Sequence, residues 1–244
     1  EFRKWLRKKI MTSADKVVVV SYFLKGIAEK IGVSKGRLKV IYNSVDFFFK
    51  NFRLDKNQCR KGLNFKGVNL ITAGRLVSWK GGEVLIEIMP KLIEKYKDVY
   101  LWIIGEGPDR EALKLQITNY KLQDNVFLVG KLSHEELFKY LKAGDIFVLN
   151  TDYEGLSHAI LEAMHIGITI VATSVCSNPE LIENGKSGFL VAYNKGEEFK
   201  KAISALIDNP ELGRIFVKEA KINLAKFKWE NLIGETTAVL KEFK

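Results

Sequence analysis

The strongest constraint on the fold is a regular alternation, from residue 68 onward, between short apolar runs and segments of helical periodicity. The apolar runs have the length of strands, as in "VNLITAG", "VYLWIIG", "VFLVG", "DIFVLN" and "TIVAT". Strands buried on both faces have continuous apolar sequences, and intervening helices make consecutive strands parallel. The sequence therefore predicts an α/β fold with a doubly wound parallel sheet. Its main helices are expected at 81–96, 109–120, 134–144, from about 155, at 197–208 and at 210–226.

The flanking segments predict a second, partial unit and two connecting pieces. "KVVVV" and "LKVIY" have the composition of strands around a helix that ends at Gly32, and the polar segment that follows is weakly periodic. "KWENLIGETTAVLKEF" predicts an amphipathic helix. We therefore expect the end of an N-terminal Rossmann-like domain (1–46), a linker with a short helix (47–66), a complete Rossmann-like domain (67–228) and a C-terminal helix packing back toward the N-terminal domain (229–244).

Composition excludes several classes of protein. No apolar run among the 244 residues is long enough to cross a bilayer. Cys59 and Cys176 stand in unrelated contexts, which indicates neither a disulfide framework nor a zinc site. We therefore expect a cytoplasmic protein. Because the chain starts at Glu1 within a helix-like segment, we also expect that the N-terminal part of a longer protein is missing.

Charge is unevenly distributed. Residues 1–66 hold 17 Lys and Arg against 5 Asp and Glu, a net charge of +12, whereas residues 67–244 hold 22 and 24, a net charge of −2. "EFRKWLRKKI" combines this charge with apolar residues at helical spacing, which suits an anionic membrane surface or a nucleic acid. The commoner alternative is a solvated helix whose apolar stripe packs on other parts of the protein.

Ligands of open α/β sheets bind beyond the carboxyl ends of the strands, so the residues after each strand are informative. "GRLVSWKGG" places Gly74, Arg75 and Lys80 on a glycine-flanked loop. Two fixed cations beside an accessible backbone suit a diphosphate, although a solvated loop would have the same spacing. "GEGPDR" lacks the third glycine of a dinucleotide fingerprint and indicates a simple turn.

The strand "VFLV" is followed by a predicted capping box and by an open stretch of backbone. Ser133 and Glu136 have the spacing of a capping box, which explains both side chains. The main chain of Lys131 and Leu132 would then lie at the edge of the sheet, where it is available to a planar base. The three histidines, His134, His158 and His165, lack the spacing of a metal site, and no Ser-His-Asp or Cys-His arrangement is visible.

The segment "DYEGLSHAILEAMHIG" predicts an anion site at the start of a helix. If the helix begins near Gly155, the amides of Leu156, Ser157 and His158 are free to bind phosphate.

The same segment carries two carboxylates, Glu154 and Glu162. Glu154 would repel phosphate but could accept hydrogen bonds from sugar hydroxyls. Glu162 lies between Leu161 and Ala163 in an apolar helix, where an unpaired carboxylate would be costly. The alternative assigns Glu154 to the helix dipole and Glu162 to the surface.

Together these segments resemble the nucleotide-sugar half of a retaining glycosyltransferase of family 4, the group 1 type with the two-domain GT-B fold. The resemblance covers nearly the whole chain and rests on the order and spacing of five segments. They are "YNSVD", "AGRLVSWKGGEVLIE", "WIIGEGPDR", "EGLSHAILEAMHIGITIVAT" with its E-x7-E element, and "NPELIENGKSGFLV". Cys176-Ser177 and Ser44 depart from glycines that are common in the family.

The resemblance implies roles for the matching residues. Arg75 and Lys80 would bind the diphosphate and neutralise the departing nucleotide, Glu154 would hold the donor sugar, and Glu162 would accept the ribose hydroxyls. The main chain near Leu132 would contact the base. The implied catalytic residues are Arg75, Lys80 and Glu154, and the implied binding residues are Gly74, Arg75, Lys80, Leu132, Glu154, Gly155, Leu156, Ser157, His158 and Glu162. No metal and no cofactor is implied.

The implied reaction is transfer of a hexose from a nucleotide diphosphate sugar to a glycan or lipid-linked acceptor with retention of configuration. Because most of the acceptor domain is missing, we expect this chain to bind nucleotide and to transfer little or no sugar. We expect its basic section to help the enzyme reach anionic lipid, and we expect no binding to nucleic acid. The alternatives are a nucleotide-sugar epimerase of the same fold and a basic module that binds membrane or nucleic acid. The base, the sugar, the acceptor and the oligomeric state have no signature in the sequence.

Overall fold

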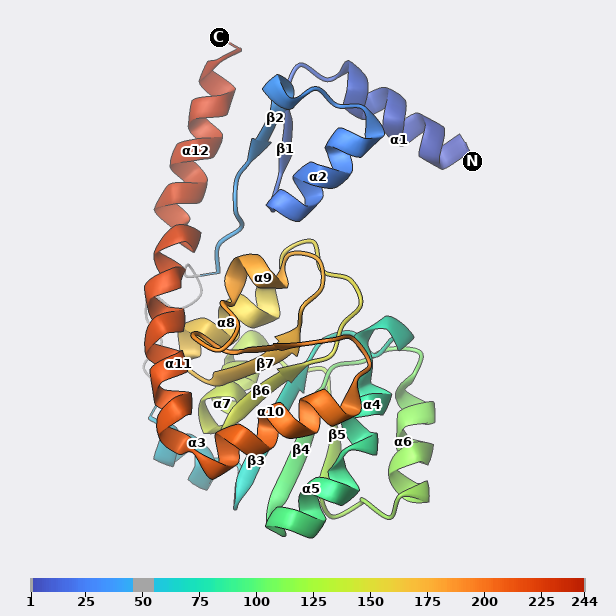
Figure 1. Cartoon of the computed structure of the whole chain (residues 1–244), viewed down its shortest axis with the longest axis vertical. Helices are drawn as coiled ribbons and strands as arrows, with labels where there is room; N and C mark the ends of the chain where they lie inside the picture. The colour runs from blue at the N-terminus through green and yellow to red at the C-terminus, as the bar shows by residue number, and fades with distance from the viewer. Residues whose placement is uncertain (1, 46–54, 244) are drawn as a thin grey trace.

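The computed structural model describes residues 2–45 and 55–243, and these form two sheets with their helices (Figure 1). The smaller sheet pairs β1 (Val17–Val19) with β2 (Leu38–Val40) in parallel. Helices α1 (Phe2–Ser13) and α2 (Tyr22–Ile31) accompany it, and Gly32 ends α2 in a left-handed conformation, as predicted. We call residues 2–45 the N-terminal section. Residues 46–54, which include the start of the predicted linker, lie outside the described residues.

The larger sheet has six parallel strands in the order β5-β4-β3-β6-β7-β8. The strand order reverses between β3 and β6, which is the switch point where doubly wound sheets bind ligands. This confirms the predicted α/β fold and its parallel sheet. The strands are β3 (Val68–Ala73), β4 (Val99–Ile104), β5 (Val126–Gly130), β6 (Ile146–Leu149), β7 (Thr169–Thr173) and β8 (Phe189–Val191).

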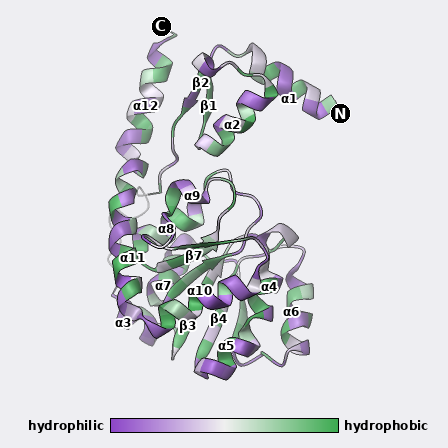
Figure 2. Cartoon of the chain, viewed as in Figure 1, coloured by the Kyte–Doolittle hydropathy of each residue, from purple (hydrophilic) through white to green (hydrophobic). Residues whose placement is uncertain are grey.

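Both faces of this sheet are buried, so its strands need apolar residues at every position. In β6, Ile146 and Val148 join one core cluster, whereas Phe147 and Leu149 join the other. In Figure 2 the strands are largely hydrophobic along their length, whereas the outer helices alternate between hydrophobic and hydrophilic residues. One face is covered by α4 (Gly82–Glu87), α5 (Met89–Tyr96), α6 (Arg110–Asn119) and α10 (Gly196–Asp208); the other is covered by α3 (Lys56–Gly62), α7 (His134–Ala143), α8 (His158–Ile166) and α9 (Asn178–Leu181).

The helices differ from prediction at three places. The helix expected at 81–96 is divided at Ile88, because Pro90 has no N–H to donate and starts a new helix, α5. The helix expected from about Gly155 begins at His158, because Ser157 caps it and its side chain accepts from the Ile160 amide. The four-residue helix α9 was not predicted.

The C-terminal helices run beside both parts of the molecule (Figure 1). α11 (Pro210–Asn223) packs on the large sheet and, after the 3₁₀ turn Leu224–Phe227, α12 (Trp229–Lys241) extends to the N-terminal section. There Glu242 forms an ion pair with Lys16 at 2.6 Å. Among the described residues, no helix is both long and apolar enough to cross a membrane.

Candidate functional site

Two predicted site residues meet at the switch point of the large sheet. Lys80 comes from the loop after β3 and Glu154 from the loop after β6, and their side chains form an ion pair. Only 23% of the Lys80 side chain and 14% of the Glu154 side chain are exposed. The pair therefore lies largely out of water, at the edge where an open α/β sheet binds its ligand.

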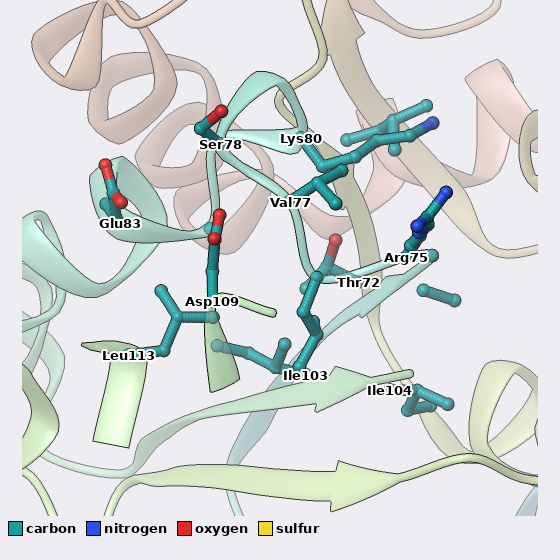
Figure 3. Close-up of a pocket in the computed structure, with 15 residues that line it drawn as sticks. Thr72, Arg75, Val77, Ser78, Lys80, Glu83, Ile103, Ile104, Asp109 and Leu113 are labelled. Atoms are coloured by element: carbon teal, nitrogen blue, oxygen red, sulfur yellow. The ribbon is translucent and has the colours of Figure 1, made fainter. Parts of the chain in front are cut away.

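Arg75 lies on the same loop and is exposed. Figure 3 shows the side chains of Arg75 and Lys80 projecting to one side of the loop, while Glu83 and Asp109 lie on the other. Arg75 forms no hydrogen bond or ion pair with the residues of 2–45 and 55–243. Its guanidinium is therefore available for bidentate binding of a phosphate.

Glu162 lies in α8 and is buried, with an exposed fraction of 7%. No donor of the described residues hydrogen-bonds to it; among them the His134 ring comes within ion-pair range, with its Nδ1 3.6 Å from a carboxylate oxygen. Burial raises the pKa of Glu162 to about 7. The alternative that places Glu162 on the surface is wrong. A buried carboxylate with no donor is costly, and hydroxyl groups of a ligand would relieve that cost.

The helix of the predicted anion site begins later than expected. Because α8 begins at His158, the amides of Leu156 and Ser157 precede the helix, and the free amides of its first turn are those of His158 and Ala159. Both Leu156 and Ser157 are buried. The Leu156 and Ser157 amides have no hydrogen-bond partner among the described residues, so the predicted amides of residues 156–158 are available to an anion, and the start of the helix adds that of Ala159.

The N-terminal section covers the start of this segment. A side chain at Gly155 would meet Leu24 of α2 at 3.3 Å, and Tyr153 packs edge-on against Phe23. The side-chain Nδ2 of Asn43 lies 3.1 Å from His158 Nε2. The loop that carries Glu154 therefore lies between the two parts of the molecule.

At the other side of the site, the end of β5 leaves main-chain groups free. Ser133 and Glu136 form the predicted capping box, with the Ser133 amide donating to Glu136 at 2.9 Å. Neither Lys131 nor Leu132 has a hydrogen-bonded backbone partner within the described part of the chain. Their main chain is therefore available, as expected for contact with a base.

The glycines of "GEGPDR" serve the packing of two loops, as the simple-turn interpretation predicts. A side chain on Gly105 would collide with the carbonyl oxygen of Gly74, and one on Gly107 with that of Leu76. The Leu76 amide donates to Glu106 O at 2.9 Å. This turn therefore packs closely against the loop that carries Arg75.

Cys176 and Ser177 contact the loop that carries Glu154. Ser177 Oγ donates to the Glu154 carbonyl at 3.1 Å, and Cys176 Sγ lies 3.6 Å from the Asp152 carbonyl. Cys176 has a φ of 53°, in the left-handed region that favours glycine. This departure from the resembled pattern therefore contacts the site directly.

Two residues that sequence reasoning missed connect the site to its surroundings. Glu180 accepts the backbone amides of Tyr22 and Phe23 and the Tyr42 hydroxyl, each at 2.9 Å. Burial and this carboxylate raise the pKa of Tyr42. Asn150, the first residue after β6, is fully buried and hydrogen-bonds the Gly81 carbonyl at 3.0 Å. Their partners are distant in sequence, so no local pattern indicates either contact.

Comparison with known proteins identifies the family. The profile of "Glycosyl transferases group 1" matches residues 55–223, more than two thirds of the chain. An uncharacterized glycosyltransferase of Methanocaldococcus jannaschii is 32% identical over 240 residues, which cover 96% of this chain and 60% of that protein. This chain belongs to the group 1 glycosyl transferases.

Other members and solved structures extend the likeness. The alpha-D-kanosaminyltransferase of Streptomyces kanamyceticus is 33% identical over 69% of this chain and 44% of its own length. The structure of Anabaena HepE in complex with UDP-glucose has a TM-score of 0.89 at 22% identity, covering 99% of this chain and 68% of HepE. The sucrose-phosphate synthase of Thermosynechococcus elongatus has the same TM-score at 23% identity, covering 99% and 61%. These likenesses confirm the GT-B fold.

This group 1 glycosyl transferase chain spans about 60% of the length of the curated relatives that it matches over most of its sequence. All of these relatives are named as glycosyltransferases. The predictions of an epimerase and of a basic binding module find no support among them.

Proposed function

We propose that this chain is the nucleotide-sugar-binding part of a retaining family 4 glycosyltransferase. The observation that carries the proposal is Glu162: a buried carboxylate, without a hydrogen-bond donor among the described residues, at the switch point of a GT-B sheet. Ribose hydroxyls would supply the missing donors. The Anabaena and Thermosynechococcus structures support the fold, and the name of the first supports a nucleotide-sugar donor.

Arg75 and Lys80 would bind the diphosphate. The bond between the anomeric carbon and the diphosphate oxygen breaks in the reaction, and negative charge gathers on that oxygen. The free Arg75 guanidinium and the largely buried Lys80 ammonium would stabilise this charge, which supports our proposal of a metal-independent reaction. Charge stabilisation in a site with little water is worth more than at the surface.

Glu154 would hold the donor sugar. In this structure its carboxylate is paired with Lys80. When the diphosphate takes Lys80 as a partner, Glu154 becomes able to accept hydrogen bonds from sugar hydroxyls. The amides of residues 156–159 would contact phosphate or sugar oxygens at the start of α8. The main chain at Leu132 would contact the base.

We keep the domain roles that the sequence predicts. Residues 67–228 would bind the donor, and residues 1–46 would be the end of the acceptor-side domain. The acceptor would be a glycan or a lipid-linked sugar. Because the chain spans about 60% of its relatives, we expect donor binding with little or no transfer.

Peripheral contact with an anionic membrane is proposed for α1. Phe2 and Trp5 are 70% and 54% exposed on a helix with no buried residue, and Lys9 lies 5.1 Å from the Trp5 ring. Basic and aromatic residues on one exposed helix suit the membrane interface. Co-sedimentation with vesicles containing phosphatidylserine is expected, and its absence would contradict this part of the proposal.

The donor assignment is tested by thermal unfolding in the presence of UDP-glucose, GDP-mannose and ADP-glucose. One of these should raise the midpoint of the wild-type chain and leave that of Glu162→Ala unchanged. Retention is tested by proton NMR of the anomeric signal of the product made by the longer polypeptide. Inversion of configuration would contradict the assignment to family 4.

A further inference from the structure

We propose that Asn150 is a positioning residue that holds Lys80 in place for the diphosphate. Asn150 acts through Gly81 and Asn194, and we call these three residues the Asn150 network. The inference rests on the proposed function, because it assigns a role to Asn150 within the same site. It adds a residue that neither the family resemblance nor the sequence pattern indicated.

The Asn150 side chain connects three loops that follow three different strands. Its Nδ2 donates to the Gly81 carbonyl at 3.0 Å and to Asn194 Oδ1 at 2.9 Å, and its Oδ1 accepts from the Asn194 amide at 3.1 Å. Asn150 is fully buried. Both of its donor hydrogens and one acceptor site are therefore used, as expected of a buried amide.

The turn that carries Lys80 depends on these bonds. Within the turn, the Gly81 amide donates to Ser78 O at 3.0 Å, which closes a single 3₁₀ turn (Ser78–Lys80). The Trp79 carbonyl of the same turn accepts a hydrogen bond from the Asp152 amide, in the loop after β6, at 2.8 Å. Gly81 has a φ of 51°, and a side chain there would collide with Asn150 Nδ2. The glycine after Lys80 is thus required by the Asn150 network.

A fixed turn matters because lysine is long and flexible. Ordering a lysine side chain costs conformational entropy, and a mobile backbone would add to that cost each time a diphosphate binds. The Asn150 network fixes the backbone after Lys80, and the Asp152 amide fixes the backbone before it, so the turn is ordered before the ligand arrives. The ammonium group is then placed beside Glu154, at the mouth of the site.

Asparagine fits this position better than aspartate would. The two groups that Nδ2 contacts, Gly81 O and Asn194 Oδ1, are both acceptors. A carboxylate of the same shape would place a third acceptor and a negative charge against them. Asn150→Asp therefore removes the two hydrogen bonds that Nδ2 donates and keeps the one accepted from the Asn194 amide, with little change in the volume of the side chain.

The test compares a nucleoside diphosphate with its nucleoside. Affinities of UDP, GDP and ADP, and of uridine, guanosine and adenosine, would be measured by ligand-observed NMR for the wild type, Asn150→Asp and Asn194→Gly. Asn194 is exposed and has a φ of 56°, so glycine keeps its backbone conformation and removes only the side chain. This variant stays informative if Asn150→Asp fails to fold.

We expect Asn194→Gly to weaken the diphosphate about 3- to 10-fold, the loss typical of one neutral hydrogen bond, and Asn150→Asp to weaken it more. The nucleoside should bind all three proteins equally. In a Lys80→Ala background, Asn194→Gly should have no further effect. Unchanged diphosphate affinity, or equal losses for nucleoside and diphosphate, would overturn the inference alone. If the wild type bound none of the nucleotides, the proposed function would be overturned together with it.

Discussion

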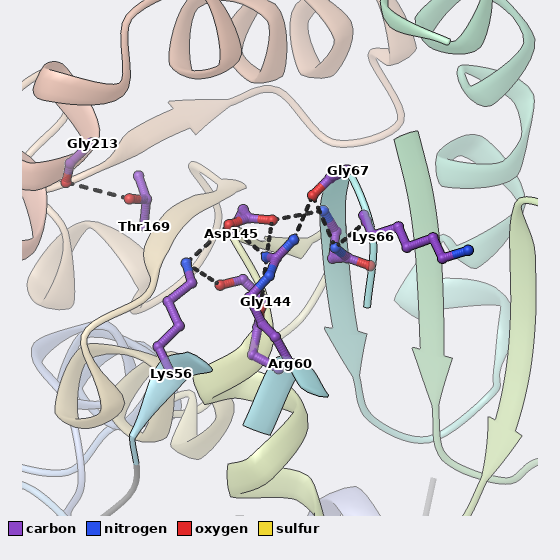
Figure 4. A network of polar contacts seen from close by, with 10 residues as sticks. Lys56, Arg60, Lys66, Gly67, Gly144, Asp145, Thr169 and Gly213 are labelled. Carbon is purple, nitrogen blue, oxygen red and sulfur yellow. Dashed lines mark hydrogen bonds and ion pairs between the residues drawn. The ribbon is translucent and has the colours of Figure 1, made fainter. Parts of the chain in front are cut away.

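The two ends of the large sheet each carry a carboxylate, half-buried Asp145 at one end and buried Glu162 at the other, and their surroundings differ. At the amino end, Asp145 accepts from Lys56 Nζ at 2.9 Å, from Arg60 at 3.0 Å and from the Asn69 amide at 2.9 Å (Figure 4). At the carboxyl end, Glu162 is more deeply buried and accepts no hydrogen bond from the described residues. The chain thus satisfies one carboxylate completely and leaves the other unsatisfied.

The pKa values of the two carboxylates are shifted in opposite directions. Burial raises the pKa of Asp145, but Lys56, the Asn69 amide and Arg60 outweigh burial and hold that pKa below its ordinary value. Burial acts alone on Glu162 and raises its pKa to about 7. A carboxylate with its hydrogen bonds satisfied stabilises the fold, whereas an unsatisfied buried one costs stability.

The largest effect on stability is expected from substitution of Asp145, at the amino end of the sheet. Asp145→Ala leaves Lys56 and Arg60 without their anion and frees the amide of Asn69. We expect the free energy of unfolding to fall by about 3 kcal/mol in urea titrations at pH 7, with nucleotide affinity unchanged. Asp124→Ala is the matched control, because Asp124 is exposed and unpaired among the described residues.

Acid should have the same effect as this substitution. Because the folded pKa of Asp145 is lowered, its contribution is present above the unfolded pKa and is lost as pH falls through the folded value. Asp145→Ala should therefore show a weaker loss of stability below pH 4 than the wild type. An equal loss in both proteins would contradict the role assigned to the Asp145 cluster.

At the carboxyl end of the sheet, substitution of the exposed cation Arg75 should affect ligand binding and not stability. Arg75→Ala removes a free guanidinium and should weaken a nucleoside diphosphate about 10- to 100-fold, the range of a charge-assisted bond of about 1.5–3 kcal/mol. Its thermal midpoint should stay at the wild-type value. Arg214→Ala, at the far side of the sheet, is the control and should leave affinity unchanged. A lowered midpoint in Arg75→Ala would indicate a structural role instead.

Glu162 should make the chain less stable as pH rises. Because its folded pKa is raised, the proton that it binds favours the folded state, and this contribution is lost as pH rises from its ordinary value near 4.5 through about 7. Glu162→Gln should abolish that loss. We expect the variant to gain about 2 kcal/mol over the wild type between pH 5 and pH 8, measured by urea unfolding. Parallel pH curves would show that Glu162 is already ionised or satisfied.

The smallest effect concerns the joint between the two parts of the molecule. Glu180→Gln weakens the acceptor for the Tyr22 and Phe23 amides, so hydrogen exchange at these two amides should become several-fold faster. Tyr42→Phe removes only the hydroxyl and should have little effect on them. Unchanged exchange in Glu180→Gln would show that α2 is held by its apolar contacts alone.

The sequence predicted the fold of the large parallel sheet because strands buried on both faces need unbroken apolar runs. It also singled out Glu162, because a carboxylate between Leu161 and Ala163 conflicts with its helix. The start of α8 was predicted less accurately, because Gly155 and Ser157 are both acceptable N-cap residues and the structure uses Ser157. Asn150 and Glu180 were beyond prediction, since their partners lie 69 and 158 residues away and depend on the tertiary fold.

The most direct test of the central claim is calorimetric titration of the wild type and of Glu162→Ala with UDP, GDP and ADP at pH 8. At this pH Glu162 is ionised in most molecules. We predict that one nucleotide binds the wild type and that the substitution weakens it at least about 10-fold, as expected when a charged acceptor is removed from two hydroxyl groups. Equal affinity of both proteins for that nucleotide would contradict the account, because the unsatisfied carboxylate would then have no part in the site.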